Sequence, residues 1–430
     1  YDNLDGGLTV FSKLDGLNSF DVTALTYNAN NNSLLVGYRD GNIDLIKGSS
    51  VVNIPDIRFA NILSAKHINN IFVDEEIAYI SCPFGLVIYN LTRMEVSETC
   101  YFNNNGLNSE VYQVCVFNNE MYSEADNFLA NKIFVGTSSG LFYANKNDNL
   151  LDYSVWKNDG QYSPSKLATD YQEIGETTIK HVVGFDSKSK GGKQLIIGTD
   201  FEKNTSYFND NSNLFAFNFD PLFKNIRAFR PIDVSGDIIS INHNTNSKKI
   251  VIISYNDVGE IIILNESFEI IGSIDFQKIN NTDFELPLSI ISGAALDNGN
   301  NEKYNQSEQL VLIDLNFGAF LIQNVDDDFI FLELIAPNGP ASTNTGTIDS
   351  YGNRLLFTHG AKTSSWNNTY NDQEISFFNN QYWETSDTLI GLEVYDAVSG
   401  CIAPNNKFFI GTWNNGLLEF ENNKLINHYN

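Results

Sequence analysis

Most catalytic sites are built from histidine, cysteine and carboxylate side chains at fixed spacings. The chain has five histidines, His67, His181, His243, His359 and His428, and no two have the HxH or HExxH spacing that places two imidazoles on one metal ion. No histidine lies near a cysteine in the sequence, and no phosphate-binding or dinucleotide-binding glycine motif is present. Carboxylates are abundant, and two of them meeting at one mouth of the fold would suit a hydrolase. The sequence therefore predicts a protein that is not an enzyme, with a hydrolase as an alternative.

One loop concentrates hard oxygen ligands. It reads Asp297-Asn298-Gly299-Asn300-Asn301-Glu302, and carboxylate and amide oxygens are the ligands that calcium prefers. The spacing departs from an EF-hand loop because the glycine comes third and amides follow it. The loop is interpreted either as a calcium site, with Asp297, Asn301 and Glu302 as ligands, or as a plain Asn/Gly turn in a protein without cofactors.

Aromatic side chains gather in the last third of the chain. An aromatic ring covers the C–H face of a sugar while neighbouring amides bond its hydroxyls. We therefore expect a ligand-binding surface made by Trp366, Tyr370, Trp383 and Trp413. In the alternative interpretation, Trp383 and Trp413 only pack between sheets.

The chain is long enough for a large folded core and is strongly acidic. It has 430 residues, of which 42% are hydrophobic and 18% charged, and a net charge of -27. No run approaches the roughly 20 apolar residues of a membrane-spanning helix, and the negative charge disfavours nucleic acid as a partner. Cys100 and Cys115 pair if two adjacent hairpins align them, and are otherwise buried thiols. The chain begins within a repeat pattern, so we expect a mature fragment of a longer protein.

Short apolar strands that end near Gly or Ser recur along the sequence, with clear copies at residues 34–37, 78–81, 133–136 and 408–411. The turn glycines Gly41, Gly85 and Gly140 follow one another at about 44 and about 55 residues, close to the length of a propeller blade. Strands that are apolar on both faces fit small sheets that bury each other's sides. Eight such units are predicted, at residues 21–60, 66–102, 110–159, 179–230, 237–276, 288–337, 343–386 and 393–430.

The pattern predicts an all-β fold, a seven- to eight-bladed β-propeller of four-stranded antiparallel blades. We expect residues 1–430 to form a single propeller domain. Within it, residues 1–20 would supply an N-terminal strand pair of an incomplete blade, and residues 21–430 the successive blades.

Two family resemblances follow from these repeats. Residues 409–417 (FIGTWNNGL) and 135–141 (VGTSSGL) resemble the propeller blades of two-component regulators of Bacteroidota. Residues 15–18 (DGLN), 35–44 (LVGYRDGNID), 78–81 (AYIS) and 84–89 (FGLVIY) are similar to the first propeller of the PorZ family of the type IX secretion system. PorZ proteins also have a second propeller and a terminal sandwich, which this chain does not contain.

The PorZ resemblance implies a non-catalytic scaffold on the cell surface, associated with the outer membrane. The partners it implies are a PorU-like sortase and PorV-like and PorQ-like outer-membrane proteins, with anionic lipopolysaccharide delivered to the sortase for anchoring secreted cargo. The first alternative is a carbohydrate-sensing propeller ectodomain of a hybrid two-component regulator. The second is a propeller hydrolase.

Overall fold

The computed structural model is built almost entirely of β-strands. It describes residues 11–104, 107–118, 131–158, 178–187, 192–199, 214–220, 225–232, 234, 236–244, 247–256, 258–276, 279, 289–295, 309–314, 318–325, 328–335, 339–340, 346–360, 363, 365–370, 375–379, 382–386, 395–405, 407–413, 415–422 and 424–429. Helical structure in these residues is limited to η1 (Lys13–Asp15), α1 (Asp56–Phe59) and η2 (Tyr153–Val155). No helix in this part of the chain has the length and apolar character needed to cross a membrane.

The strands are grouped into consecutive antiparallel sheets, each formed by neighbouring strands of the sequence. The first two sheets are β1 (Val22–Asn28), β2 (Ser33–Tyr38), β3 (Ile43–Lys47) and β4 (Ser50–Ile54), and β5 (Asn70–Asp74), β6 (Ile77–Cys82), β7 (Gly85–Asn90) and β8 (Glu95–Cys100). A short pair, β9 (Asn103–Asn104) and β10 (Leu107–Asn108), precedes the third sheet of β11 (Val111–Phe117), β12 (Lys132–Thr137) and β13 (Gly140–Asn145).

Five further sheets of four strands follow within the described residues. They are β14 (Ile179–Ser187), β15 (Gly192–Thr199), β16 (Leu214–Asp220) and β17 (Asn225–Ile232); β18 (Asp237–Asn244), β19 (Lys249–Asn256), β20 (Val258–Asn265) and β21 (Ile270–Asp275); β22 (Ile290–Ala295), β23 (Gln309–Asp314), β24 (Gly318–Val325) and β25 (Asp328–Ile335); β26 (Thr347–Tyr351), β27 (Arg354–Thr358), β28 (Ser376–Asn379) and β29 (Tyr382–Thr385); and β30 (Ala397–Ile402), β31 (Lys407–Thr412), β32 (Leu417–Glu421) and β33 (Lys424–Tyr429). Each of these sheets lies inside one of the eight predicted units, except that β17 ends two residues beyond its unit.

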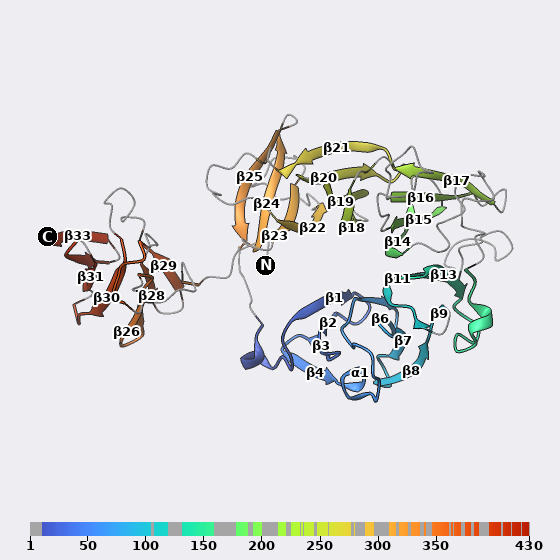
Figure 1. Ribbon diagram of the computed structural model, residues 1–430, viewed down its shortest axis with the longest axis horizontal. Coiled ribbons are helices and arrows are strands. Elements are labelled where there is room, and N and C mark those ends of the chain that lie inside the picture. Colours follow the sequence, from blue (N-terminus) through green and yellow to red (C-terminus); the bar gives the residue numbers. More distant parts are fainter. Residues whose placement is uncertain are drawn as a thin grey trace. The chain divides into compact units, whose positions relative to one another are not determined.

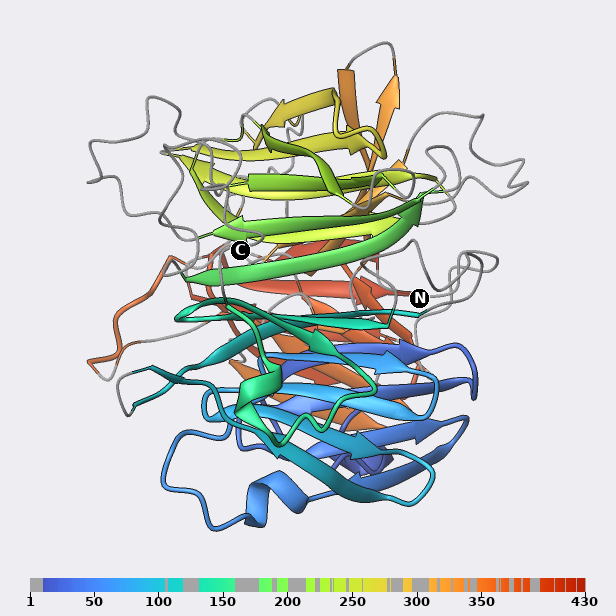
Figure 2. The same ribbon diagram turned by 90° about the vertical axis from the view of Figure 1, so that its right-hand side faces the viewer.

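The sheets belong to two compact units, which we describe separately. The N-terminal unit holds the sheets from β1 to β25, and the C-terminal unit holds those from β26 to β33 (Figure 1). In the N-terminal unit the first strand of each sheet contacts the first strand of the next, in the order β1, β5, β11, β14, β18 and β22. Figure 2 shows the sheets of this unit following one another in the order of the sequence, from blue through green and yellow to orange. The prediction of one domain over residues 1–430 is not tested by this division and stays a prediction.

Within each unit, apolar side chains fill the space between successive sheets. On β19, Ile252 belongs to the core shared with the sheet before it, and Ile253 to the core shared with the sheet after it. Both side chains are fully buried. Adjacent residues of a strand point to opposite faces, so a middle strand must be apolar at every position. In the C-terminal unit, Leu356, Phe377 and Ile410 are part of the same kind of core between the two sheets.

The third sheet differs from the predicted four-stranded blade. Among the described residues, only a single β-bridge between Tyr143 and Lys157 lies at the outer edge of β13. The chain between them carries η2 and Trp156, which is 6% exposed and meets Phe102 edge-on with ring centroids 4.9 Å apart. The Trp156 indole N–H donates to the carbonyl of Leu150 at 2.9 Å. A packed aromatic segment therefore covers the place of a fourth strand.

The segment before β1 differs from the strand pair expected there. Residues 11–20 contain η1 and no strand, so the expected strand pair over residues 1–20 is wrong for this stretch, and residues 1–10 lie outside the described residues. Ser12 caps η1 by accepting a hydrogen bond from the backbone N–H of Leu14, and η1 ends at Gly16, which has a left-handed backbone conformation.

Cys100 and Cys115 are both free and buried. The interpretation of these residues as buried thiols is therefore confirmed, and the alternative of a disulfide is not.

A buried carboxylate on the third strand of a sheet recurs in both units. Asp44 on β3 is fully buried and accepts hydrogen bonds from the Tyr38 hydroxyl (2.8 Å), the Asn53 amide group (2.9 Å) and the Asn18 backbone N–H (2.8 Å). A buried carboxylate is stable only when donors surround it in this way. These bonds tie the outer strands of the first sheet to the segment that precedes it.

Glu419 on β32 repeats the arrangement. Its carboxylate accepts from Lys407 Nζ (2.5 Å), from the amide of Asn427 (2.8 Å) and from the hydroxyl of Tyr429 (2.6 Å). Asp44 and Glu419 each face an asparagine directly across on the fourth strand. In both sheets, a hydrogen bond between this carboxylate and the asparagine therefore joins the third strand to the fourth.

Replacing Glu419 with Gln is expected to lower the melting temperature at pH 7, with a difference that shrinks in acid. The hydrogen bonds from Lys407, Tyr429 and Asn427 hold the pKa of Glu419 at about 2, below its ordinary 4.5. The stabilisation is thus complete above the pKa of the unfolded chain and is lost as the pH falls through about 2. Thermal unfolding followed by circular dichroism between pH 7 and pH 2 measures it. The control is Glu421→Gln, an exposed position on the same strand, and a Glu419→Gln deficit that stays constant over this range would contradict the assignment.

Candidate functional site: an axial cavity and an aromatic cluster

Polar side chains on the first strands bond to the backbone of the next first strand. Asn69, at the start of β5, donates to the carbonyl of Val111 at 2.8 Å, and the amide oxygen of Gln113 on β11 accepts from the N–H of Val182 on β14 at 3.0 Å. Asn244 on β18 donates to the carbonyl of Ala295 on β22 at 2.7 Å. Within the described residues, no backbone hydrogen bonds of the β-sheet type join neighbouring sheets. These side chains therefore bond to backbone N–H and C=O groups that have no partner within their own sheet.

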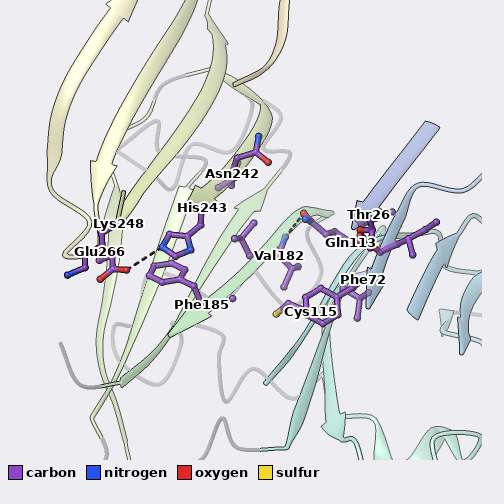
Figure 3. A pocket seen from close by; sticks show the side chains of 16 residues that line it. Thr26, Phe72, Gln113, Cys115, Val182, Phe185, Asn242, His243, Lys248 and Glu266 are labelled. Atoms are coloured by element: carbon purple, nitrogen blue, oxygen red, sulfur yellow. Dashed lines mark hydrogen bonds and ion pairs between the residues drawn. The ribbon is translucent and has the colours of Figure 1, made fainter. Parts of the chain in front are cut away.

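A cavity of about 960 Å³ lies among these first strands in the N-terminal unit. Its walls come from β1, β5, β11, β14 and β18, with Lys248 from the turn after β18 and Glu266 from the turn after β20. Figure 3 shows Thr26, Phe72 and Gln113 on one side of it, and Phe185, His243 and Glu266 on the other. Five consecutive sheets thus contribute to one hollow. Its volume is at the upper end of the range for small-ligand pockets.

His243 and Glu266 form a buried pair in this wall. The ring Nε2 lies 3.4 Å from the carboxylate Oε1, and the two side chains are 5% and 6% exposed. Phe185 stacks on the imidazole with centroids 4.0 Å apart and a 19° angle between the rings. Burial lowers the pKa of His243, and Glu266 opposes that shift only in part. His243 is therefore a neutral imidazole at pH 7.

The cavity wall lacks the features of a nucleophilic or metal centre. Burial raises the pKa of the Cys115 thiol, which keeps it protonated. Within the described part of the chain, no group of three or more His, Cys, Asp or Glu side chains is placed to hold a metal ion. Residues 136–140 read G-x-S-x-G, a spacing that sequence reasoning had overlooked. They join β12 to β13 in a hairpin and not a strand to a helix, so they form no nucleophile elbow.

Three of the four predicted aromatic residues lie near one another in the C-terminal unit. The carboxylate of buried Asp396 accepts from the backbone N–H of Tyr370 (2.9 Å), and its own carbonyl accepts from the N–H of Trp413 (3.1 Å). Trp366 and Tyr370 are 65% and 69% exposed and Trp413 is 37% exposed. We call Trp366, Tyr370 and Trp413 the aromatic cluster. Asp396 holds the backbone of Tyr370 and Trp413, and the N–H of Trp366 donates to the carbonyl of Thr363 in the same loop as Tyr370.

The remaining predicted site residues are placed differently or lie outside the described residues. Trp383 on β29 packs edge-on against Phe357 at 4.7 Å and against Phe378 at 5.2 Å, which makes it part of the face of its sheet. Asp297, Asn301 and Glu302 lie outside the described residues, so the calcium prediction stays a prediction. The cavity itself was missed from the sequence, because its wall residues share no local motif.

His243→Gln is expected to destabilise the protein less at pH 5 than at pH 7.5. The unfolded chain takes up a proton at His243 near pH 6.5, whereas the fold holds the ring neutral. The stability that His243 contributes is thus complete above 6.5 and declines as the pH falls below it. Denaturant unfolding of both proteins at the two pH values measures this, with the exposed His428→Gln as control. A His243 ring signal that titrates at or above 6.5 in NMR spectra would contradict the lowered pKa.

Comparison with known proteins agrees with this architecture. Residues 1–157 match the family described as the N-terminal β-propeller domain of PorZ of the type IX secretion system. The chain is similar in structure to PorZ of Porphyromonas gingivalis, described as an essential bacterial surface component of that system, with a TM-score of 0.55 and 16% identity. The similarity covers 98% of this chain and 48% of that one, so this chain spans about half of that protein. No match was found among curated proteins.

Two further structures are similar at lower scores. The dihydro-heme d1 dehydrogenase NirN has a TM-score of 0.42 and 12% identity, covering 94% of this chain and 73% of the enzyme. The extracellular domain of a putative one component system of B. thetaiotaomicron has a TM-score of 0.38 and 11% identity, covering 96% and 60%. TM-scores below 0.5 support no conclusion about this chain.

The PorZ similarity confirms the all-β propeller fold, while the number of blades stays a prediction. Over residues 1–157, the chain is therefore similar to the N-terminal β-propeller domain of PorZ of the type IX secretion system.

Proposed function

We propose that this protein is a non-catalytic propeller component of a type IX secretion system. Its place is the cell surface, in association with the outer membrane, as a scaffold for the complex that attaches secreted cargo. The observation that carries the proposal is the PorZ family match over residues 1–157. Repeated cores between sheets support a rigid scaffold, because an inner sheet such as β5–β8 packs against a sheet on either side of it.

The partners follow from the family and the surface. A PorU-like sortase and PorV-like and PorQ-like outer-membrane proteins are the protein partners in this proposal. The loop from Pro55 to Asn69 suits such a contact, because Phe59 and Leu63 are exposed while Lys66 Nζ donates to the carbonyls of Arg58 (2.9 Å) and Ala60 (2.7 Å). Exposed apolar side chains on a fixed loop are typical of protein contact sites.

The aromatic cluster is the proposed contact for the lipopolysaccharide glycan. The rings of Trp366, Tyr370 and Trp413 offer apolar faces that can cover the C–H surface of a sugar. The net charge of -27 disfavours direct contact with anionic groups, so we propose contact with neutral sugars or through bridging divalent cations.

Removal of the gene from its native bacterium is expected to release cargo from the cell surface into the medium, because the scaffold would no longer bring cargo to the sortase. Surface-exposed cargo is quantified by protease shaving, and a tagged copy of the full-length protein is used to capture the PorU-like sortase from membranes. Re-expression of the unmodified protein is the control. Normal cargo attachment together with no captured sortase would rule out the secretion role.

The double variant Trp366→Ala/Tyr370→Ala is expected to weaken binding to purified lipopolysaccharide at least fivefold, because both rings are exposed and neither supports the core. Biolayer interferometry with immobilised lipopolysaccharide measures the change. The matched control is Tyr101→Ala, which removes an exposed ring from the N-terminal unit. Equal binding by the double variant and the unmodified protein would assign the glycan to another surface.

A further inference from the structure

The cavity wall combines apolar side chains with amide groups. Apolar residues from the first strands, among them Phe72, Val183 and Phe185, make up much of the wall, and Gln113 and Asn242 stand between them. A site of this composition suits a ligand that buries apolar groups and is oriented by a few hydrogen bonds.

Each of the two amides has one end fixed by the fold. Gln113 Oε1 accepts from the N–H of Val182, and Asn242 Nδ2 donates to the carbonyl of Gly293 at 3.0 Å and to Ser292 Oγ at 3.1 Å. These bonds decide which end of each amide is nitrogen and which is oxygen. Gln113 Nε2 and Asn242 Oδ1 have no hydrogen-bond partner in the part of the chain that the structure describes. Gln113 and Asn242 therefore offer one amide donor and one amide acceptor, and Asn70, whose Oδ1 also has no partner among the described residues, is a third amide in the lining.

The charges of the wall balance. Lys248 is cationic, Glu266 is anionic, and the buried His243 beside Glu266 is neutral at pH 7. The lining has no net charge, although the chain as a whole carries -27. The lining thus has no excess charge of either sign to attract a charged ligand, which would lose part of its hydration on entry.

A peptide group has the complementary chemistry. Its C=O accepts from an amide N–H and its N–H donates to an amide oxygen, which are the groups left over on Gln113 and Asn242. Aliphatic and aromatic peptide side chains match the Val and Phe surfaces. A sugar fits less well, because a hydroxyl on each carbon needs more hydrogen-bond partners than the polar side chains between the Val, Ile and Phe residues of the wall supply.

We propose that the cavity among β1, β5, β11, β14 and β18 binds an uncharged peptide segment through an aliphatic or aromatic side chain, with Gln113 and Asn242 pairing with its backbone. This inference is independent of the proposed role in secretion.

The test is isothermal titration calorimetry of the full 430-residue chain with acetyl-Ala-Val-Phe-amide. The expected dissociation constant is on the order of 1 mM or tighter, since a short blocked peptide buries little surface. Acetyl-Asp-Val-Asp-amide and maltotriose serve as charged and saccharide probes, and each is expected to bind at least tenfold more weakly. Failure of the tripeptide to bind, or equal binding by maltotriose, would overturn the proposal.

A matched pair of variants locates the site. Val183→Asp places a charge in the cavity wall and is expected to weaken tripeptide binding at least tenfold. Val96→Asp makes the same change at an exposed position on β8, outside the cavity, and is expected to bind as the unmodified chain does. Where Val183→Asp does not fold by circular dichroism, Val183→Thr replaces it, with Val96→Thr as control and an expected weakening of about threefold. Equal effects at the two positions would place the peptide elsewhere.

Discussion

Burial of both faces of every inner sheet is the constraint on which the structure depends. A four-stranded sheet cannot cover its own faces, so each must be packed against another sheet. On β19 this makes Ile252 and Ile253 face two different cores. Glycines allow the backbones of neighbouring sheets to approach each other closely at some positions. A Cβ at Gly136 would lie 2.6 Å from the carbonyl oxygen of Ile179 in the next sheet, so no larger residue fits without moving β14.

Hydrogen bonds add direction to this apolar packing. Hydrophobic contact alone would allow one sheet to slide over the next, because it is not directional. Side chains such as Asn69, Gln113 and Asn244 fix the register by bonding to backbone groups of the neighbouring first strand. In the C-terminal unit, Asp349 on β26 accepts from the N–H of Ile402 on β30 in the same way. Asparagine on these strands therefore has a structural role beyond closing turns.

The repeated sheets could be predicted from the sequence, whereas features that occur once, such as the Trp156 segment and the cavity, could not. Strand-length apolar runs and their turn glycines located the eight sheets of three or four strands in the described residues, since each sheet is formed by neighbouring segments. The substitute for a fourth strand around Trp156 was not predicted, because no pattern of alternation marks it. The sequence also could not tell that Trp366 is exposed whereas Trp383 packs against Phe357, because both are tryptophans in similar polar surroundings. The cavity brings together Gln113 and Asn242 from distant repeats, and no local spacing records that proximity.

The two candidate sites differ in how tightly they are coupled to the fold. In the cavity, Gln113 and Asn242 each join neighbouring sheets with one end of the amide and also belong to the lining. A substitution that alters the ligand contact would therefore also remove a bond between sheets, so the specificity of the cavity can change only at the expense of stability. The aromatic cluster is held by backbone bonds to Asp396, which do not depend on the identity of the exposed side chains. Its rings can be exchanged while the loop keeps its position, so this surface is the more easily adapted to a new partner.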